Sequence, residues 1–164
     1  MKTRTANPDD FDAVLALNLE SERFLSPLTR ERLGWLHQAA DFHQVLEVEG
    51  EVVAFVLALR EGASYDSVNY RWFVEHYERF LYIDRVVVAA AQHGRGYGRV
   101  LYELAFARAL ETSVPVVTCE YDIEPHNLAS ERFHQKFRFA EVGRQSVAGG
   151  RKQVSLQAAS VVRE

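Results

Sequence analysis

Three glycines on alternate positions are the most chemically suggestive pattern in the chain. Gly94, Gly96 and Gly98 follow an apolar segment that ends at Val88 and precede a segment whose apolar residues have helical spacing. The N–H groups at a helix start lack internal partners and lie at the positive end of the helix dipole. Glycine has no Cβ and tolerates positive φ, so a phosphate can approach these groups. The pattern indicates a phosphate or diphosphate site, and the alternative is a turn that only reverses the chain.

Two common nucleotide-binding fingerprints do not fit this loop. A dinucleotide-binding loop has the spacing G-x-G-x-x-G, and a P-loop ends in G-K-[ST]. Here the glycines are spaced G-R-G-Y-G, and Gly98 is followed by Arg99 and Val100. The sequence therefore favours another kind of phosphate site.

Cysteine and histidine indicate neither a metal site nor a disulfide. The six histidines show no metal-ligand spacing, and His126 and His134 are close in sequence without such a spacing. Cys119, the only cysteine, lies in an apolar segment and is interpreted as a small core residue rather than a nucleophile. A lone cysteine forms no disulfide within the chain, so we expect a reducing compartment, the cytoplasm.

The glycine loop must be positioned by a strand before it and a helix after it. The strand ends at Val88 and is rich in β-branched residues, which is typical of a buried strand. The helix is predicted from apolar residues at helical spacing. These are Val100, Leu101, Leu104, Ala105 and Leu110.

Two helices and a hairpin are predicted upstream. Asn7 followed by Pro8 and two acids is a strong helix start, and this helix should run to about Glu20. A second helix should begin near Thr29, with an irregular connection or short helix over Ser21 to Leu28. Two strands, Phe42 to Val48 and Val52 to Leu59, should be joined by a tight turn at Glu49-Gly50-Glu51.

An aromatic insert from Glu61 to Phe80 has no decisive periodicity. Its rings belong to Tyr65, Tyr70, Trp72, Phe73, His76, Tyr77 and Phe80. The first interpretation is a flap that fills a local core; the alternative is an aromatic wall for a substrate, or a dimer contact. Asp66 and Asn69 could contact an ammonium group, or could be ordinary solvated positions.

Downstream, a strand, a helix and two further strands are predicted. Val114 to Asp122 is typical of a buried strand, and a strand–helix–strand order favours a parallel crossover. The segment from Glu124 to Asn127 should end that strand and cap a helix. Phe139 to Val147 and Gln153 to Val161 should pair antiparallel around Gly149-Gly150. Without a repeat or linker, residues 1–164 are predicted to form a single domain.

Two segments resemble the GNAT superfamily of N-acetyltransferases. The glycine loop is similar to its motif A, in which a strand ending in valine leads into [RQ]-x-x-G-x-[GA]; His93 stands where Arg or Gln is usual. Asn127 to Phe139 is similar to the closing motif N-x-x-[AS]-x-x-[FL]-[YH]-x-[KR]-x-G-F. There His134 replaces the commoner Tyr, as in the branch with phosphinothricin acetyltransferase. Phe137 replaces the usual Leu and Arg138 the usual Gly.

The resemblance implies a mixed α/β fold, with a mostly antiparallel sheet, one parallel central strand pair and flanking helices. It implies transfer of an acetyl group from acetyl-CoA to a primary amine by direct attack on the thioester. The loop would hold the diphosphate, the strand edge at Val86 to Val88 would pair with pantetheine, and an N–H near Val88 would bind the thioester carbonyl. Asn127 would bond the pantetheine arm. The implied coenzyme A contacts are Val86, Val87, Val88, His93, Gly94, Arg95, Gly96, Tyr97, Gly98, Arg99, Asn127, Ser130, Phe133 and His134.

Proton transfer in such a reaction needs an acid and a base. His134 is the candidate for protonating the departing thiolate, or it packs against coenzyme A without transferring a proton. Asp84 and Glu120, on the two central strands, are candidates for deprotonating the amine, and each could instead be an ordinary paired carboxylate. Phe24, Tyr65, Tyr70 and Trp72 are the candidates for binding the acceptor.

Composition limits the partners. The chain has 164 residues, 48% of them hydrophobic, and suits a packed globular protein. A formal net charge of −4 without a basic run argues against nucleic acid. No apolar run is long enough to span a membrane, and the first residues do not resemble a signal peptide. We therefore expect a small-molecule or peptide amine as partner, with a homodimer plausible through the apolar C-terminal strands. A non-catalytic acyl-CoA-binding module and an interaction protein are the alternatives.

Overall fold

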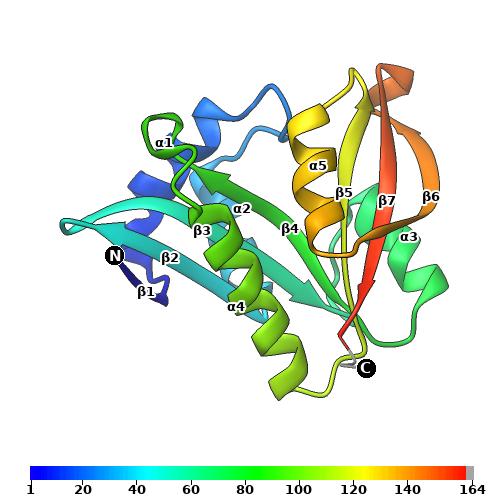
Figure 1. Ribbon diagram of the computed structural model, residues 1–164, viewed down its shortest axis with the longest axis horizontal. Coiled ribbons are helices and arrows are strands. Elements are labelled where there is room, and N and C mark those ends of the chain that lie inside the picture. The colour runs from blue at the N-terminus through cyan, green and yellow to red at the C-terminus, as the bar shows by residue number, and fades with distance from the viewer. Residues whose placement is uncertain (162–164) are drawn as a thin grey trace. The chain divides into compact units, whose positions relative to one another are not determined.

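The computed structural model describes residues 1–161 and has a mixed α/β fold (Figure 1). Seven strands follow one another in the order β1-β2-β3-β4-β5-β7-β6. β4 and β5 pair in parallel, whereas β1–β2, β2–β3, β5–β7 and β6–β7 pair antiparallel. This confirms the predicted fold class.

The strands are β1 (Lys2–Thr5), β2 (Phe42–Val48), β3 (Glu51–Arg60), β4 (Leu81–Val88), β5 (Val116–Glu124), β6 (Ala140–Val147) and β7 (Lys152–Ser160). The α-helices are α1 (Phe11–Glu20), α2 (Arg30–Ala39), α3 (Val68–His76), α4 (Tyr97–Glu111) and α5 (Leu128–Lys136).

The chain divides into two compact units. Unit 1 comprises residues 1–59 and 83–108, and unit 2 comprises residues 60–82 and the chain from residue 109 onward. Each unit is formed by two separate stretches of sequence. The single acetyltransferase domain expected from the sequence stays a prediction.

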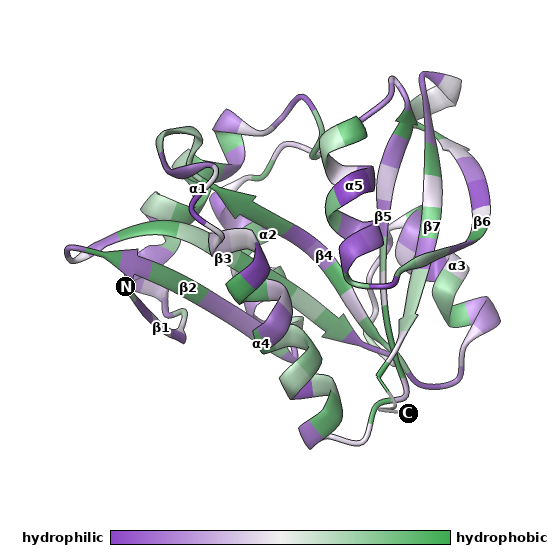
Figure 2. Ribbon diagram, viewed as in Figure 1, coloured by the Kyte–Doolittle hydropathy of each residue, from purple (hydrophilic) through white to green (hydrophobic). Residues whose placement is uncertain are grey.

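In unit 1 the predicted hairpin and helices are confirmed. Glu49 and Gly50 form its turn with φ of 53° and 82°, conformations that a two-residue hairpin turn requires. β3 is buried along nearly its whole length and is strongly hydrophobic (Figure 2). Asn7 caps a short 3-10 helix (Pro8–Asp10) that leads into α1.

β1 was not predicted, because a short polar segment carries no apolar pattern. Arg4 on this strand donates hydrogen bonds to both Asp10 and Glu47.

α4 packs through a narrower stripe than its sequence predicts. Leu101, Ala105 and Ala109 are fully buried and recur every fourth residue. Leu110 supported the prediction of the helix, which is confirmed, but it lies next to this stripe and 52% of it is exposed. A helix advances about 100° per residue, which turns Leu110 away from the face of Ala109.

Unit 2 contains the aromatic insert and the C-terminal strands. The insert forms α3, whose N-terminus is capped by Ser67. β6 and β7 form the predicted antiparallel pair around Gly149 and Gly150. β5 begins at Val116, two residues later than expected. Val114 is still part of the turn that follows α4, because its N–H donates to the carbonyl of Ala109.

Candidate active site

The predicted phosphate loop lies in unit 1 and follows β4 (Figure 1). Gly94 and Gly96 have φ of 81° and 82°, in the left-handed region that favours glycine. A Cβ built on either residue would meet no atom within 4 Å. These glycines are therefore required by backbone conformation rather than by a packed neighbour, and the space beside them is open.

The N-terminus of α4 follows the two glycines at once. α4 begins at Tyr97, and Val100 N–H makes the first bond of the helical ladder, 3.2 Å from the carbonyl of Gly96. The N–H groups of Tyr97, Gly98 and Arg99 precede that ladder. Gly98 therefore lies in the first helical turn rather than in the glycine turn, which corrects the expectation of three turn glycines.

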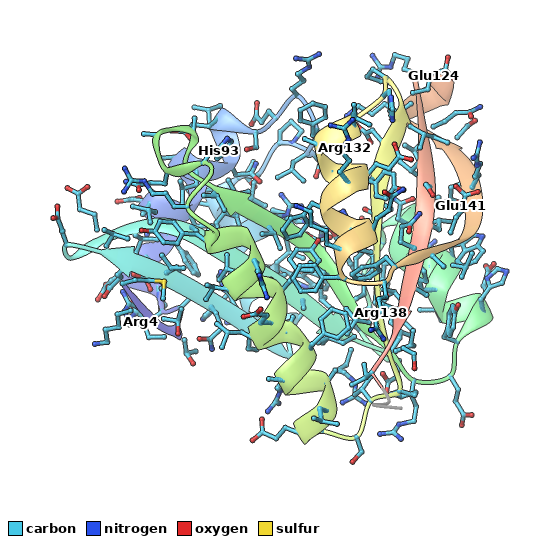
Figure 3. The ribbon with its side chains drawn as sticks, viewed as in Figure 1. Arg4, His93, Glu124, Arg132, Arg138 and Glu141 are labelled. Carbon is cyan, nitrogen blue, oxygen red and sulfur yellow. The ribbon has the colours of Figure 1, made fainter. Side chains whose placement is uncertain are left out.

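His93 stands at the position where the family motif has Arg or Gln (Figure 3). Its Nε2 lies 2.9 Å from the carbonyl oxygen of Val88. A carbonyl only accepts, so this nitrogen carries the hydrogen. The imidazole ties the loop back to the end of β4, a role in loop geometry that the motif comparison did not suggest. Of the three β4 valines predicted to face coenzyme A, Val87 is buried and Val86 and Val88 are half-buried.

Asp84, one of the two candidate bases, is held in a buried ion pair. Its Oδ2 lies 2.7 Å from Nε of Arg85, and the two side chains are 4% and 5% exposed. Arg85 also donates to Asn18 Oδ1, at 3.0 Å, and to Ser26. The geometry favours the paired-carboxylate interpretation, with Arg85 fastening the irregular segment of residues 21–28. Phe24, in the same segment, is exposed and remains a candidate for contacting an acceptor.

Glu120, the other candidate base, is the centre of a hydrogen-bond network in unit 2. Tyr82 Oη donates to the carboxylate and lies 2.9 Å from Oε1 and 2.8 Å from Oε2. Asn69 Nδ2 donates to Oε1 at 3.1 Å, and Gln145 Nε2 donates to Asn69 Oδ1 at 2.7 Å. Glu120 itself is half-buried. Both donors favour the ionised carboxylate, and ionisation is what a general base requires.

His134 is buried on α5 and is held in one tautomer. Its Nδ1 lies 2.6 Å from the carbonyl oxygen of Ser130, so Nδ1 carries the hydrogen. Burial lowers the pKa of His134, and the hydrogen bond to the Ser130 carbonyl offsets only part of this decrease. The neutral ring therefore predominates at pH 7. Its ring contacts those of Tyr121, Phe133 and Phe139. Asn127, predicted to bond pantetheine, caps α5 by accepting from Ser130 N–H through Oδ1.

Glu120 and His134 serve opposite faces of β5. Adjacent strand residues point to opposite sides of a sheet. The Tyr121 ring centroid lies 5.3 Å from that of His134 on α5, whereas its neighbour Glu120 bonds Asn69 on α3. α5 and α3 therefore cover the two different faces of this strand.

Three of the aromatic residues proposed to contact the acceptor have structural roles. Tyr65 and Tyr70 are buried in a ring cluster with Phe73, Phe80 and Tyr82. Tyr70 Oη donates to the carbonyl of Arg60 at 2.7 Å. Trp72 stacks on His76 and packs so closely on Gly143 that a Cβ there would overlap the indole. The local-core interpretation of the insert is therefore the one that the geometry supports for these rings.

Tyr82 and Gln145 belong to the network and were not singled out from the sequence. Each lies on a strand, at positions 38 and 25 residues from Glu120. Only the pairing of β4, β5, β7 and β6 brings these strands into one sheet. No local motif marks such residues.

Within residues 1–161 there is no group of three or more His, Cys, Asp or Glu side chains that could hold a metal ion. Over the same residues, no helix is long and apolar enough to cross a membrane. Cys119 is buried, as its apolar surroundings predicted.

Comparison with known families assigns the class of protein. The chain matches the Acetyltransferase (GNAT) family over residues 11–139, a span that takes in parts of both units. The chain therefore belongs to the GNAT family, whose members transfer acetyl groups and use acetyl-CoA as the cofactor. This confirms the resemblance drawn from the two motifs.

Solved structures show the same fold at low sequence identity. Ard1 of Thermoplasma volcanium has a TM-score of 0.79 and 16% identity, covering 99% of this chain and 98% of that one. The ribosomal-protein-S18-alanine N-acetyltransferase of Escherichia coli has a TM-score of 0.73 and 14% identity, covering 99% and 95%. The yncA protein of Salmonella typhimurium, solved with its cofactor acetyl-CoA, has a TM-score of 0.72 and 20% identity, covering 100% and 95%. No curated protein gives a significant match.

Proposed function

We propose that this protein is an acetyl-CoA-dependent N-acetyltransferase that acts on a primary amine of a small molecule or peptide. The observation that carries the proposal is the loop in which two left-handed glycines, Gly94 and Gly96, lead directly into the N-terminus of α4. Family membership supports acetyl transfer as the chemistry.

The residues of this loop fit a diphosphate. The positions where Cβ atoms would stand at Gly94 and Gly96 are open, so a ligand can approach the backbone there. The N–H groups of Tyr97, Gly98 and Arg99 would donate to phosphate oxygens at the positive end of the helix dipole. Arg95 and Arg99 are exposed cations on the same loop and helix start. Acetyl-CoA, when bound, supplies an acetyl group activated as a thioester.

The backbone of β4 has the second role. An N–H near Val88 would donate to the carbonyl oxygen of the acetyl group, where negative charge develops during attack. The bond between His93 and the Val88 carbonyl fixes the backbone at this point. A fixed donor needs no reorganisation during the reaction, which is why its rigidity supports the proposal.

Glu120 is the residue that we propose as general base. An amine reaches the enzyme mainly as an ammonium ion and must lose a proton before it attacks. Tyr82 and Asn69 hold the Glu120 carboxylate in place and favour its ionised form. Asp84 is a weaker candidate because its carboxylate already neutralises Arg85.

His134 would pack against the coenzyme rather than donate a proton. Donation requires the imidazolium, and burial disfavours that form. The neutral ring has its hydrogen committed to the Ser130 carbonyl. The acid role remains the competing prediction.

The acceptor is proposed as a class only. The name of the similar Escherichia coli enzyme refers to an alanine of a ribosomal protein, which makes a peptide N-terminal amine one member of the panel to test. Cys119 is the only cysteine of the chain and is buried, which supports the cytoplasm as the location.

The test has two stages. Calorimetry should first detect binding of coenzyme A. Thiol release from acetyl-CoA should then be measured with alanine-terminated peptides, a lysine-containing peptide with a blocked N-terminus, free amino acids and polyamines. We expect amine-dependent release with at least one class. Coenzyme A binding without release for any amine would favour an acyl-CoA-binding module, and absence of binding would refute the proposal.

A further inference from the structure

Two side-chain amides lead from β6 to the Glu120 carboxylate, and their polarity is fixed. A carboxylate only accepts, so Asn69 must present its amide nitrogen to Glu120, at 3.1 Å. The carbonyl of Asn69 is then turned toward Gln145, which must donate to it, at 2.7 Å. Reversal of either amide would place two acceptors against each other. Gln145, a residue on β6, therefore determines that Asn69 presents its amide nitrogen and not its carbonyl oxygen to Glu120.

Packing between α3 and β6 holds Asn69 in this position. Trp72 lies one helical turn after Asn69, and Gly143 lies two residues before Gln145 on the same side of β6. The indole of Trp72 occupies the space where a Cβ of residue 143 would lie. One face of α3 thus meets one face of β6 through a polar pair and an apolar pair, and together they define the register of the helix against the strand.

We infer that Asn69 and Gln145 form a two-amide relay that positions the Glu120 carboxylate and keeps it ionised for proton abstraction from the acceptor amine. The inference rests on the proposed function, in which Glu120 is the base. Asn69 and Gln145 are positioning residues, because each acts through Glu120. The relay extends the machinery from β5 to α3 and β6, outside both sequence motifs of the family.

The relay predicts that the donor at Gln145, rather than its size, matters. In Gln145→Glu the new carboxylate can only accept, so Asn69 must turn its amide nitrogen toward residue 145. Its carbonyl oxygen then faces Glu120, and an acceptor beside a carboxylate raises the pKa of that carboxylate. In Gln145→Leu nothing compels Asn69 to turn, so Asn69 should continue to donate to Glu120.

Other charges near the relay are accounted for by a matched control. In unit 2, Glu120 accepts hydrogen bonds from Tyr82 on β4 and from the uncharged Asn69 on α3. Two residues along β5 lies Asp122, whose Oδ2 is 3.4 Å from Nζ of Lys152 on β7. β6 carries the paired Glu141 and Arg144, and α3 carries Arg71, Glu75 and His76, all of them exposed. Ser146→Glu places the same negative charge on β6 next to Gln145, on the opposite side of the strand.

The experiment measures the pH dependence of kcat/KM for the amine in the wild type and the three variants, together with ¹³C NMR titration of Glu120. We expect Gln145→Glu to raise the apparent pKa of the acidic limb of the kcat/KM profile by about 1 unit. On the acidic side of that limb kcat/KM for the amine should fall about tenfold, whereas KM for acetyl-CoA should not change. Gln145→Leu should shift the limb by less than half as much, and Ser146→Glu should leave it in place. Equal shifts in Gln145→Glu and Ser146→Glu, or none in either, would overturn the relay.

The two proposals can fail separately. A wild type without turnover toward any amine would refute the proposed function, whereas the NMR titration would still report whether residue 145 controls the ionisation of Glu120. An active wild type whose Glu120 titration is the same in all variants would refute only the relay. Thermal denaturation of each variant shows whether it is folded before either measurement is interpreted.

Discussion

The hydroxyl of Tyr82 lies within 2.9 Å of one carboxylate oxygen of Glu120 and 2.8 Å of the other. One phenol thus bridges the whole carboxylate, and it is held by burial in the aromatic cluster of the insert, where its ring lies 5.6 Å from that of Tyr70. A rigid donor of this kind aligns the carboxylate and stabilises its charge. The aromatic insert therefore contributes to the candidate site by supporting Glu120.

Removing this donor should raise the pKa of Glu120. In Tyr82→Phe the ring remains and the hydroxyl is lost, so the ionised carboxylate loses a hydrogen bond. We expect the acidic limb of the pH profile of kcat/KM for the amine to move up by about 1 pH unit, so that kcat/KM falls by up to about tenfold on the acidic side of that limb and keeps its wild-type value on the plateau. The pH–rate profile is the measurement.

Tyr70→Phe is the matched control for this variant. Tyr70 belongs to the same cluster and is equally buried, but its hydroxyl donates to the carbonyl of Arg60 rather than to Glu120. Its loss should lower stability by about 1 kcal/mol without moving the pH–rate profile. A profile that moves equally in both variants would assign the effect to packing of the cluster.

The two left-handed glycines of the loop should be needed for coenzyme A binding. In Gly96→Ala the side chain strains a backbone with φ of 82° and projects into the open space beside the loop. We expect the affinity for coenzyme A, measured by calorimetry, to fall at least about tenfold.

Gly50→Ala separates this effect from strain alone. Gly50 also has φ of 82° and open space beside it, but it lies in the β2–β3 turn. Both variants should lose about 1 kcal/mol of stability, and only Gly96→Ala should lose affinity. Equal affinities in the two variants would remove the loop from the binding site.

Most of the fold followed from local pattern, because caps, turn residues and apolar periodicity act over a few residues. Thr29, Ser67 and Asn127 all cap helices through their side chains. The site was predictable only where a motif is continuous in sequence, as in the loop after Val88. The other residues of the Glu120 network, Tyr82, Asn69 and Gln145, come from three different elements, so only strand order and helix packing bring them together. β1 escaped prediction for the same reason, since a short polar edge strand is defined by its neighbour.

Arg138 shows why a departure from the motif has a physical cost. It occupies the position where the family motif has Gly, and its φ is 63° at the end of α5. Its N–H donates to the carbonyl of Gln135 at 3.0 Å, as expected after a helix C-terminus. We expect Arg138→Gly to raise the free energy of unfolding by about 0.5–1 kcal/mol, because glycine adopts this conformation without strain. Urea denaturation is the measurement, and Arg138→Ala, which keeps the strain, should not stabilise.

His134 offers a direct test between packing and proton donation. If it packs in the neutral form, His134→Phe should keep kcat at pH 8 within about threefold of the wild type, since general acid catalysis contributes about 10²–10⁴. Coenzyme A affinity, measured in parallel, controls for lost binding. A decrease in kcat of a hundredfold with affinity retained would show that His134 donates the proton.

A buried histidine in unit 1 should make stability depend on pH. The pKa of His43 is lowered to about 4, mainly by burial and secondly by the neighbouring His37. The negative charge of Asp10 raises this pKa and offsets part of the decrease. Its Nδ1 lies 2.8 Å from that of His37, and its buried Nε2 has no hydrogen-bond partner within the described residues. The unfolded chain takes up a proton below about pH 6.5, whereas the folded protein does so only near pH 4. The unfolded state is therefore favoured as pH falls through this window.

We expect the free energy of unfolding to fall by about 2 kcal/mol between pH 7 and pH 5 through His43 alone. Asp10 contributes almost nothing between pH 7 and pH 5, because the ordinary pKa of its carboxyl, 3.8, lies below this window and the bond to Arg4 lowers that pKa further. His134, whose pKa is also lowered by burial, contributes equally to the wild type and to His43→Phe. Urea denaturation of both proteins at pH 7 and pH 5 isolates the effect, since phenylalanine fills the same space next to Phe55 without titrating. An equal loss of stability in the two proteins would mean that His43 takes up its proton at the same pH in the folded and unfolded states.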